Sequence, residues 1–179
     1  MPKAQLIHHD FTGLRLQIES ELAFEEALRR LREKTGRTTV GEIGVAAAAA
    51  PSVEEFHKDV TKRFVGPSGF MIFSEMDHGE WISRYGIHRR VLRVILGNPL
   101  IAITLMRHDI SAGLFAPVEI LLVENEPGLG CTVHYVRPST LMLIDGNAAL
   151  ASAASELDRK LDLLMSDVTG LRGHLTKQG

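Results

Sequence analysis

The chain has 179 residues, 45% of them hydrophobic and 23% charged, and its 20 basic and 22 acidic side chains give a formal net charge of -2. This length favours one domain, because domains typically hold roughly 100–200 residues, and the apolar fraction excludes a wholly disordered chain. The slightly acidic balance argues against nucleic acid as a partner, because proteins that bind its phosphate backbone usually carry a basic excess. The single cysteine, Cys131, excludes an internal disulfide and a cysteine-rich zinc site.

Neither a signal peptide nor a membrane-spanning segment is expected. The N-terminal residues lack the apolar core of a signal peptide. The longest apolar stretches fall far short of the roughly 20 residues that a membrane helix needs. With one free thiol and no export signal, we expect a cytoplasmic protein that does not act at a membrane.

A strand and a helix are expected to open the fold. Residues 14–19 alternate apolar and polar side chains, which is the period-two pattern of a half-buried strand. Residues 24–34 then carry apolar side chains at helical spacing, with Ser20 as the expected N-cap and Gly36 at the expected end.

The next segment, residues 37–68, is interpreted as an insertion and not as a linker between domains. Residues 38–40 could form a short strand, and residues 46–50 favour helix. Ser52 begins a further helix with a capping box. The whole chain, residues 1–179, is therefore expected to form a single domain that contains an inserted helix.

Four more strands, a turn with a short helix over residues 74–82, and two longer helices are expected in the rest of the chain. The strands are residues 70–73, 91–96, 117–124 and 131–136, the last two joined by a loop rich in turn formers. Asn98 and Pro99 begin a helix, because asparagine is a good N-cap and proline suits the first helical position. An apolar stripe between Leu150 and Val168 predicts a long closing helix. The sum is an α+β fold in which helices cover one face of a mostly antiparallel sheet.

The order of these motifs resembles the bacterial and fungal family catalogued as domain of unknown function 302. The matching residues are Glu75-Met76-Asp77-His78, Gly97-Asn98-Pro99-Leu100, Pro117-Val118-Glu119, Val133-His134-Tyr135-Val136-Arg137-Pro138-Ser139 and the long terminal helix. The resemblance implies a TBP-like α+β fold with the outline β-α-β-β-β-β-α, in agreement with the periodicity. Two features depart from the family pattern: members usually lack residues 37–68, and they usually have Leu-Pro where this chain has Ala116-Pro117.

This resemblance implies almost nothing about function. A TBP-like topology is shared by carriers of apolar ligands and by saddles that bind DNA, so the fold alone does not select between them. The acidic charge balance counts against the DNA-binding version.

Asp77 and His78 are the first candidates for binding or catalysis. Adjacent residues on a turn can place a carboxylate beside an imidazole, and histidine works as a base or as a ligand near neutral pH. The alternative is a local turn that a hydrogen-bonded histidine supports.

Asn98, Glu119 and His134 complete the set of candidate residues. Asn98 caps a helix whose N-terminus could also hold an anionic ligand. Glu119 and His134 lie on neighbouring predicted strands and could face each other, forming with Asp77 and His78 a metal or acid–base cluster. The alternative is a solvated cross-strand pair, and with strand register open we predict no metal site.

The densest positive patch contains Arg84, His88, Arg89, Arg90 and Arg93. It could receive a phosphate or carboxylate ligand. It could equally be a solvated strand edge that charge protects against further pairing.

The leading functional hypothesis is a non-catalytic domain that binds a small, partly apolar ligand between the sheet and the helices, without a cofactor. The residues expected to orient this ligand are Asp77, His78, Asn98, Glu119 and His134. The chain has many apolar residues, few polar residues that could converge on a ligand, and no recognisable catalytic motif, which supports this hypothesis. One alternative is a homodimer or other interaction module, formed through the inserted helix or an exposed sheet edge. Another is a hydrolase-like or isomerase-like enzyme that uses Asp77 and His78 as an acid–base pair.

Overall fold

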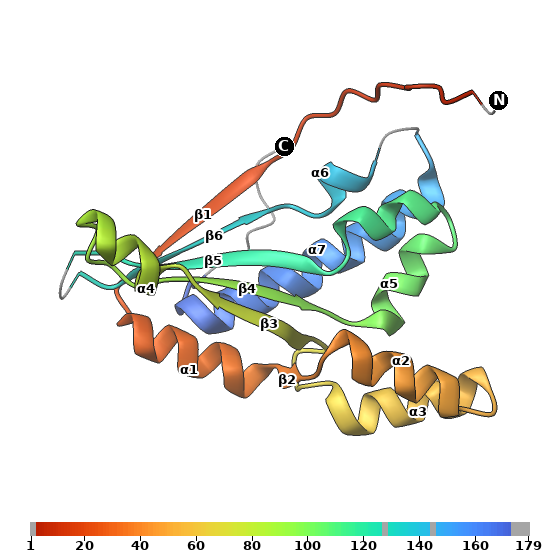
Figure 1. Cartoon of the computed structure of the whole chain (residues 1–179), viewed down its shortest axis with the longest axis horizontal. Helices are drawn as coiled ribbons and strands as arrows, with labels where there is room; N and C mark the ends of the chain where they lie inside the picture. Colours follow the sequence, from red (N-terminus) through yellow and green to blue (C-terminus); the bar gives the residue numbers. More distant parts are fainter. Residues whose placement is uncertain (1–2, 127–128, 144–145, 173–179) are drawn as a thin grey trace.

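The computed structural model describes residues 3–126, 129–143 and 146–172, which contain one six-stranded sheet packed against helices (Figure 1). The strands are β1 (Arg15–Ser20), β2 (Gly36–Arg37), β3 (Met71–Asp77), β4 (Val91–Gly97), β5 (Val118–Glu124) and β6 (Cys131–Val136). Their order is β1-β6-β5-β4-β3-β2, and neighbours are antiparallel except β2 and β3, which are parallel. The expected α+β fold with a mostly antiparallel sheet is confirmed.

The helices lie against the sheet and at its ends. They are α1 (Phe24–Lys34), α2 (Val40–Ala49), α3 (Val53–Phe64), α4 (Gly79–Ile82), α5 (Pro99–Met106), α6 (Ser139–Met142) and α7 (Ala148–Thr169), with 3-10 turns η1 (Ser83–Tyr85) and η2 (Ile110–Phe115). Figure 1 shows α7, in blue, crossing behind the strands. None of the described helices is long and apolar enough to cross a membrane.

The main core forms between the sheet and the helices α1 and α7. Alternate residues of β4, namely Leu92, Val94 and Leu96, are buried against these helices. The long helix α7 buries the apolar stripe between Leu150 and Val168 that the sequence predicts. Both burial patterns follow from the periodicity of the sequence. Alternate residues of a strand share one face, and residues three or four apart share one stripe of a helix, so each apolar set can be buried against the other.

Ser20 was expected to cap α1, and this expectation is wrong. The helix begins after Ala23 with no side-chain cap. The Ser20 hydroxyl instead donates to the Thr169 carbonyl at 2.6 Å, which ties the end of β1 to the end of α7. The Ser20 hydroxyl therefore makes a tertiary hydrogen bond instead of capping the nearby helix.

Residues 38–40 do not form the short strand that the sequence allows. The strand β2 ends at Arg37, and Thr39 caps α2 through reciprocal hydrogen bonds with Glu42. This capping box satisfies helix N–H groups that have no partner within the helix, and so it outweighs the weak strand preference of residues 38–40.

The helices α2 and α3 form a hairpin within residues 37–68. Its own small core contains Ala46, Val60, Phe64 and Met71. At the base of the hairpin two backbone segments cross, and the Phe70 carbonyl accepts from the Gly36 N–H at 2.9 Å and from the Gly66 N–H at 3.0 Å. A Cβ atom at residue 36 would lie 1.7 Å from the Phe64 carbonyl oxygen, so this approach requires glycine.

A buried polar network joins β6 and α6 to α7. The Tyr135 hydroxyl donates to Asp162 Oδ1 at 2.9 Å, and Arg137 Nη2 donates to Asp162 Oδ2 at 3.4 Å. One turn earlier on α7, Asp158 accepts from the backbone N–H of Ser139 at 3.0 Å. Burial raises the pKa of Asp158, and burial together with the charge of Asp162 raises the pKa of Tyr135.

The Asp158→Asn variant should be more stable than the wild type at pH 7, and the difference should shrink towards pH 4. A carboxyl group whose pKa is higher in the folded than in the unfolded state stabilises the fold at low pH, and this stabilisation is lost as the pH rises through the raised pKa. Asparagine keeps an acceptor for the Ser139 N–H but carries no buried charge. Urea unfolding at both pH values tests this, and an advantage that grows on acidification would contradict it.

Candidate functional site

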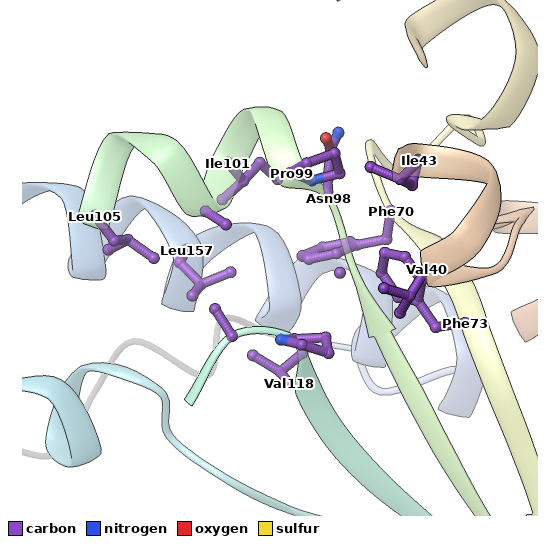
Figure 2. A pocket seen from close by; sticks show the side chains of 14 residues that line it. Val40, Ile43, Phe70, Phe73, Asn98, Pro99, Ile101, Leu105, Val118 and Leu157 are labelled. Atoms are coloured by element: carbon purple, nitrogen blue, oxygen red, sulfur yellow. The ribbon is translucent and has the colours of Figure 1, made fainter. Parts of the chain in front are cut away.

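An apolar pocket of about 190 Å³ lies at the end of the sheet, where β4 leads into α5 (Figure 2). Figure 2 shows side chains from α2, α5, α7 and the ends of the central strands gathered around it. The lining residues are Val40, Ile43, Phe70, Phe73, Gly97, Asn98, Pro99, Ile101, Ala102, Leu105, Ala116, Pro117, Val118 and Leu157. Asn98 is the single polar side chain among them.

The turn between β4 and α5 forms the rim of the pocket. Asn98 Oδ1 accepts from the Leu100 N–H at 2.8 Å, and its Nδ2 donates to the Gly69 carbonyl at 2.8 Å. Pro99 takes the first helical position, where an N–H has no partner in the helix. The helix start predicted from these two residues is confirmed. Because both the oxygen and the nitrogen of the Asn98 amide make hydrogen bonds to the backbone, Asn98 stabilises the rim of the pocket.

One wall of the pocket comes from the helical hairpin. Val40 and Ile43 of α2 line the pocket, and Ile43 also packs on the small core of the hairpin. On another side Gly97 allows a close approach, because a Cβ atom there would lie 3.0 Å from Pro117 Cβ. The shape of the pocket therefore depends on where the hairpin rests.

Glu119 and His134 lie on the face of the sheet opposite α1 and α7. They are diagonal neighbours, because His134 pairs directly with Leu121. Both line a shallow hollow with Arg15 and Arg93, and Arg93 Nε donates to Glu119 Oε2 at 3.0 Å. Burial and the charge of Arg15 lower the pKa of His134.

Asp77 and His78 lie at the opposite end of β4 from the apolar pocket. Asp77 Oδ1 accepts from the Glu80 N–H at 3.4 Å, and His78 Nδ1 accepts from Trp81 Nε1 at 3.3 Å. These contacts support the short helix α4. Among the described side chains no hydrogen bond joins Asp77 to His78.

The candidate residues therefore occupy three separate places. Asn98 is at the apolar pocket, Glu119 and His134 share the opposite sheet face, and Asp77 with His78 lies beside α4. Within the described ranges no group of three or more His, Cys, Asp or Glu side chains could hold a metal ion.

The positive patch of residues 84–93 has carboxylate and carbonyl partners. Arg89 donates to the Glu124 carbonyl at 2.7 Å, and Arg90 pairs with Glu25 and lies over the Phe24 ring. With Arg93 paired to Glu119, three of its four arginines already have acceptors. The interpretation as a strand edge is wrong, because β4 pairs with β3 on one side and with β5 on the other. The arginines are instead held by carboxylate and carbonyl acceptors of the fold.

Sequence reasoning did not single out the residues that enclose the pocket. Phe70 and Leu105 are fully buried and belong to the main core, and Ala102 is a small residue on α5. The one signal that pointed here was Asn98-Pro99, which fixes the start of α5. Most of the apolar lining residues are the same types as core residues, so the sequence does not distinguish a pocket wall from the core.

Comparisons with known proteins identify relatives by family and by fold. A family model described as "Domain of unknown function DUF302" matches residues 45–168. A crystal structure described as an uncharacterized conserved protein DUF302 from Bacillus stearothermophilus has a TM-score of 0.58 at 13% identity, covering 86% of this chain and 97% of that chain. At that identity the likeness shows the fold alone. A search of the curated proteins found no match.

Proposed function

Because the chain belongs to the DUF302 family, whose description assigns no function, we propose a function from the pocket itself: the protein binds a small apolar molecule, or the apolar end of a larger one, beneath α5. The observation that carries this proposal is a preformed pocket with an almost wholly apolar lining. Apolar cavities accept apolar ligands of matching size.

The size of the pocket limits the class of ligand. A cavity of about 150 Å³ lined by aliphatic and aromatic side chains can hold benzene, so a pocket of about 190 Å³ suits a single ring or a short alkyl segment. Any polar part of the ligand would extend past the rim towards solvent, because the Asn98 amide is already hydrogen-bonded.

The lining also supports binding without chemistry. Its fourteen residues include no acid, base or nucleophilic side chain, whereas catalysis of proton or acyl transfer needs such groups within hydrogen-bond reach. A cytoplasmic location is part of the same proposal, and the free, buried thiol of Cys131 suits a reducing compartment.

The Ala102→Phe variant should lose at least about tenfold in affinity for benzene and indole, because the added ring occupies the space beneath α5. Isothermal titration and the rise in melting temperature at saturating probe measure this loss. Ala149→Phe is the matched control, since Ala149 is exposed in the first turn of α7.

Equal affinity of the two variants would contradict the proposed location. If the wild type binds neither benzene nor indole, and binds no short-chain alcohol either, the proposed function is wrong.

A further inference from the structure

The face of the sheet opposite α1 and α7 carries three rows of side chains, and we call it the open face. Register places Gln17, His134, Leu121, Arg93 and Met76 across the middle row. On one side of it Glu19 pairs with Thr132, and Val123 pairs with Val91. On the other side Arg15 pairs with Val136, and Glu119 pairs with Ile95. Figure 1 shows no described helix crossing the middle of β1, β6, β5 and β4 on this side.

The open face is more apolar than the solvated side of an antiparallel sheet usually is. Such sheets alternate apolar residues towards the core with polar residues towards water. Here five apolar side chains point away from α1 and α7 and are only half-buried: Val91, Ile95, Leu121, Val123 and Val136. Met76 beside them is 40% exposed. Val91, Val123 and Leu121 are direct neighbours in the register, and Ile95 and Val136 are diagonal to Leu121. An exposed apolar cluster of this kind marks an interaction surface.

From this pattern we infer that the open face binds a second copy of the same chain, sheet against sheet, about a two-fold axis that runs along the middle row. Rotation about this axis exchanges the two outer rows. Ile95 then meets Val91 of the partner subunit, and Leu121 meets Leu121 of the partner subunit. Two sheets packed face to face with roughly aligned strands form the same contact inside single β-sandwich domains.

Charge on the edge strand supports this arrangement. Arg15 and Glu19 are exposed at the two ends of β1, and the rotation sets Arg15 against Glu19 of the partner subunit on both sides of the axis. The same rotation sets Arg93 against Arg93 of the partner subunit, and there each charge is offset by a hydrogen bond from Arg93 to Glu119 of its own chain. A self-complementary pattern of this kind is what an isologous contact requires.

The area also fits a second copy. Five strands spaced about 4.8 Å apart and six residues of about 3.3 Å each give a face of roughly 24 by 20 Å, or about 500 Å² per subunit. Two such faces bury roughly 1,000 Å², which is the lower bound for a specific dimer. An axis parallel to the strands above β6 would overlap only three strands of each copy, so the axis along the middle row is favoured.

Sedimentation equilibrium of the full chain tests the inference. We expect a dimer of twice 19.7 kDa at micromolar concentration. Leu121→Glu should raise the dissociation constant at least about 100-fold, because it buries two facing carboxylates at the centre. Leu163→Glu should leave it unchanged, because Leu163 is 49% exposed on α7. A monomeric wild type at about 100 μM, or equal effects of both variants, would overturn the proposal.

A charge exchange on β1 tests the axis without touching the apolar centre. Arg15→Glu and Glu19→Arg should each weaken the dimer about fivefold or more, because each sets like charges against each other. The double variant should return to within about twofold of the wild type. If the two single effects instead add in the double variant, the proposed two-fold axis is wrong.

Discussion

Replacing Gly36 by alanine should lower the free energy of unfolding by about 3 kcal/mol or more, because a side chain there collides with backbone. The added Cβ would lie 1.7 Å from the Phe64 carbonyl oxygen and 2.9 Å from the Gly66 nitrogen. Relief requires β2 to move away from the base of the α2–α3 hairpin, which breaks the hydrogen bonds from Gly36 and Gly66 to the Phe70 carbonyl. Chemical denaturation monitored by circular dichroism measures the loss.

Gly44→Ala is the matched control for this substitution. Gly44 lies within α2, and no heavy atom is near enough to touch an added Cβ. Alanine should therefore stabilise the protein by up to about 1 kcal/mol through its higher helix propensity. Because α2 supplies Val40 and Ile43 to the pocket wall, Gly36→Ala should also weaken probe binding, whereas Gly44→Ala should not. Equal stability of the two variants would show that the crossing at Gly36 tolerates a side chain.

Asp162→Ala should lower the free energy of unfolding by about 3 kcal/mol. Asp162 is 8% exposed, and it accepts from both the Tyr135 hydroxyl and the Arg137 guanidinium. Removing the carboxylate leaves a buried hydroxyl and a largely buried charge without this acceptor, and breaking a buried ion pair costs about 3–5 kcal/mol. Urea titration at pH 7 measures the loss.

Tyr135→Phe supplies the comparison. This substitution should lower the free energy of unfolding by only about 1 kcal/mol, because the Asp162 carboxylate keeps its pairing with Arg137. If Asp162→Ala costs no more than Tyr135→Phe, then the carboxylate does not hold this network together.

Most of the fold could be predicted because its elements follow simple periodicities. Period-two alternation in β1 and β6, and the long stripe on α7, directly reflect burial on one face. The Asn98-Pro99 start of α5 rests on local hydrogen bonding, which needs no tertiary information. Two local predictions failed. The Ser20 hydroxyl bonds to the distant Thr169 carbonyl instead of capping a helix, and Thr39 caps α2 instead of lying in a strand.

The arrangement of the candidate residues could not be predicted, because it depends on strand register. Asp77 lies opposite Leu92, whereas Asn98 follows the end of β4. Six residues of extended chain span roughly 20 Å, so these two residues cannot contact one small ligand together. Glu119 and His134 do share a face, but it is the face away from the pocket.

Apart from Asn98-Pro99 at its rim, the pocket could not be located from the sequence. Its lining combines core residues such as Phe70 with residues of α2, and the position of α2 is set by the glycine crossing at its base. That residues 37–68 are an insertion relative to other family members stays a prediction. What the structure adds is that this segment supplies part of the pocket wall.

A crystal of the protein pressurised with xenon tests whether the pocket beneath α5 binds apolar ligands, because xenon enters apolar cavities without needing a polar partner. We expect xenon density between Phe70, Leu105 and Leu157, and we expect this density to be lost in the Ala102→Phe variant. Xenon bound only elsewhere, or unchanged in that variant, would contradict the proposal that this pocket is the binding site.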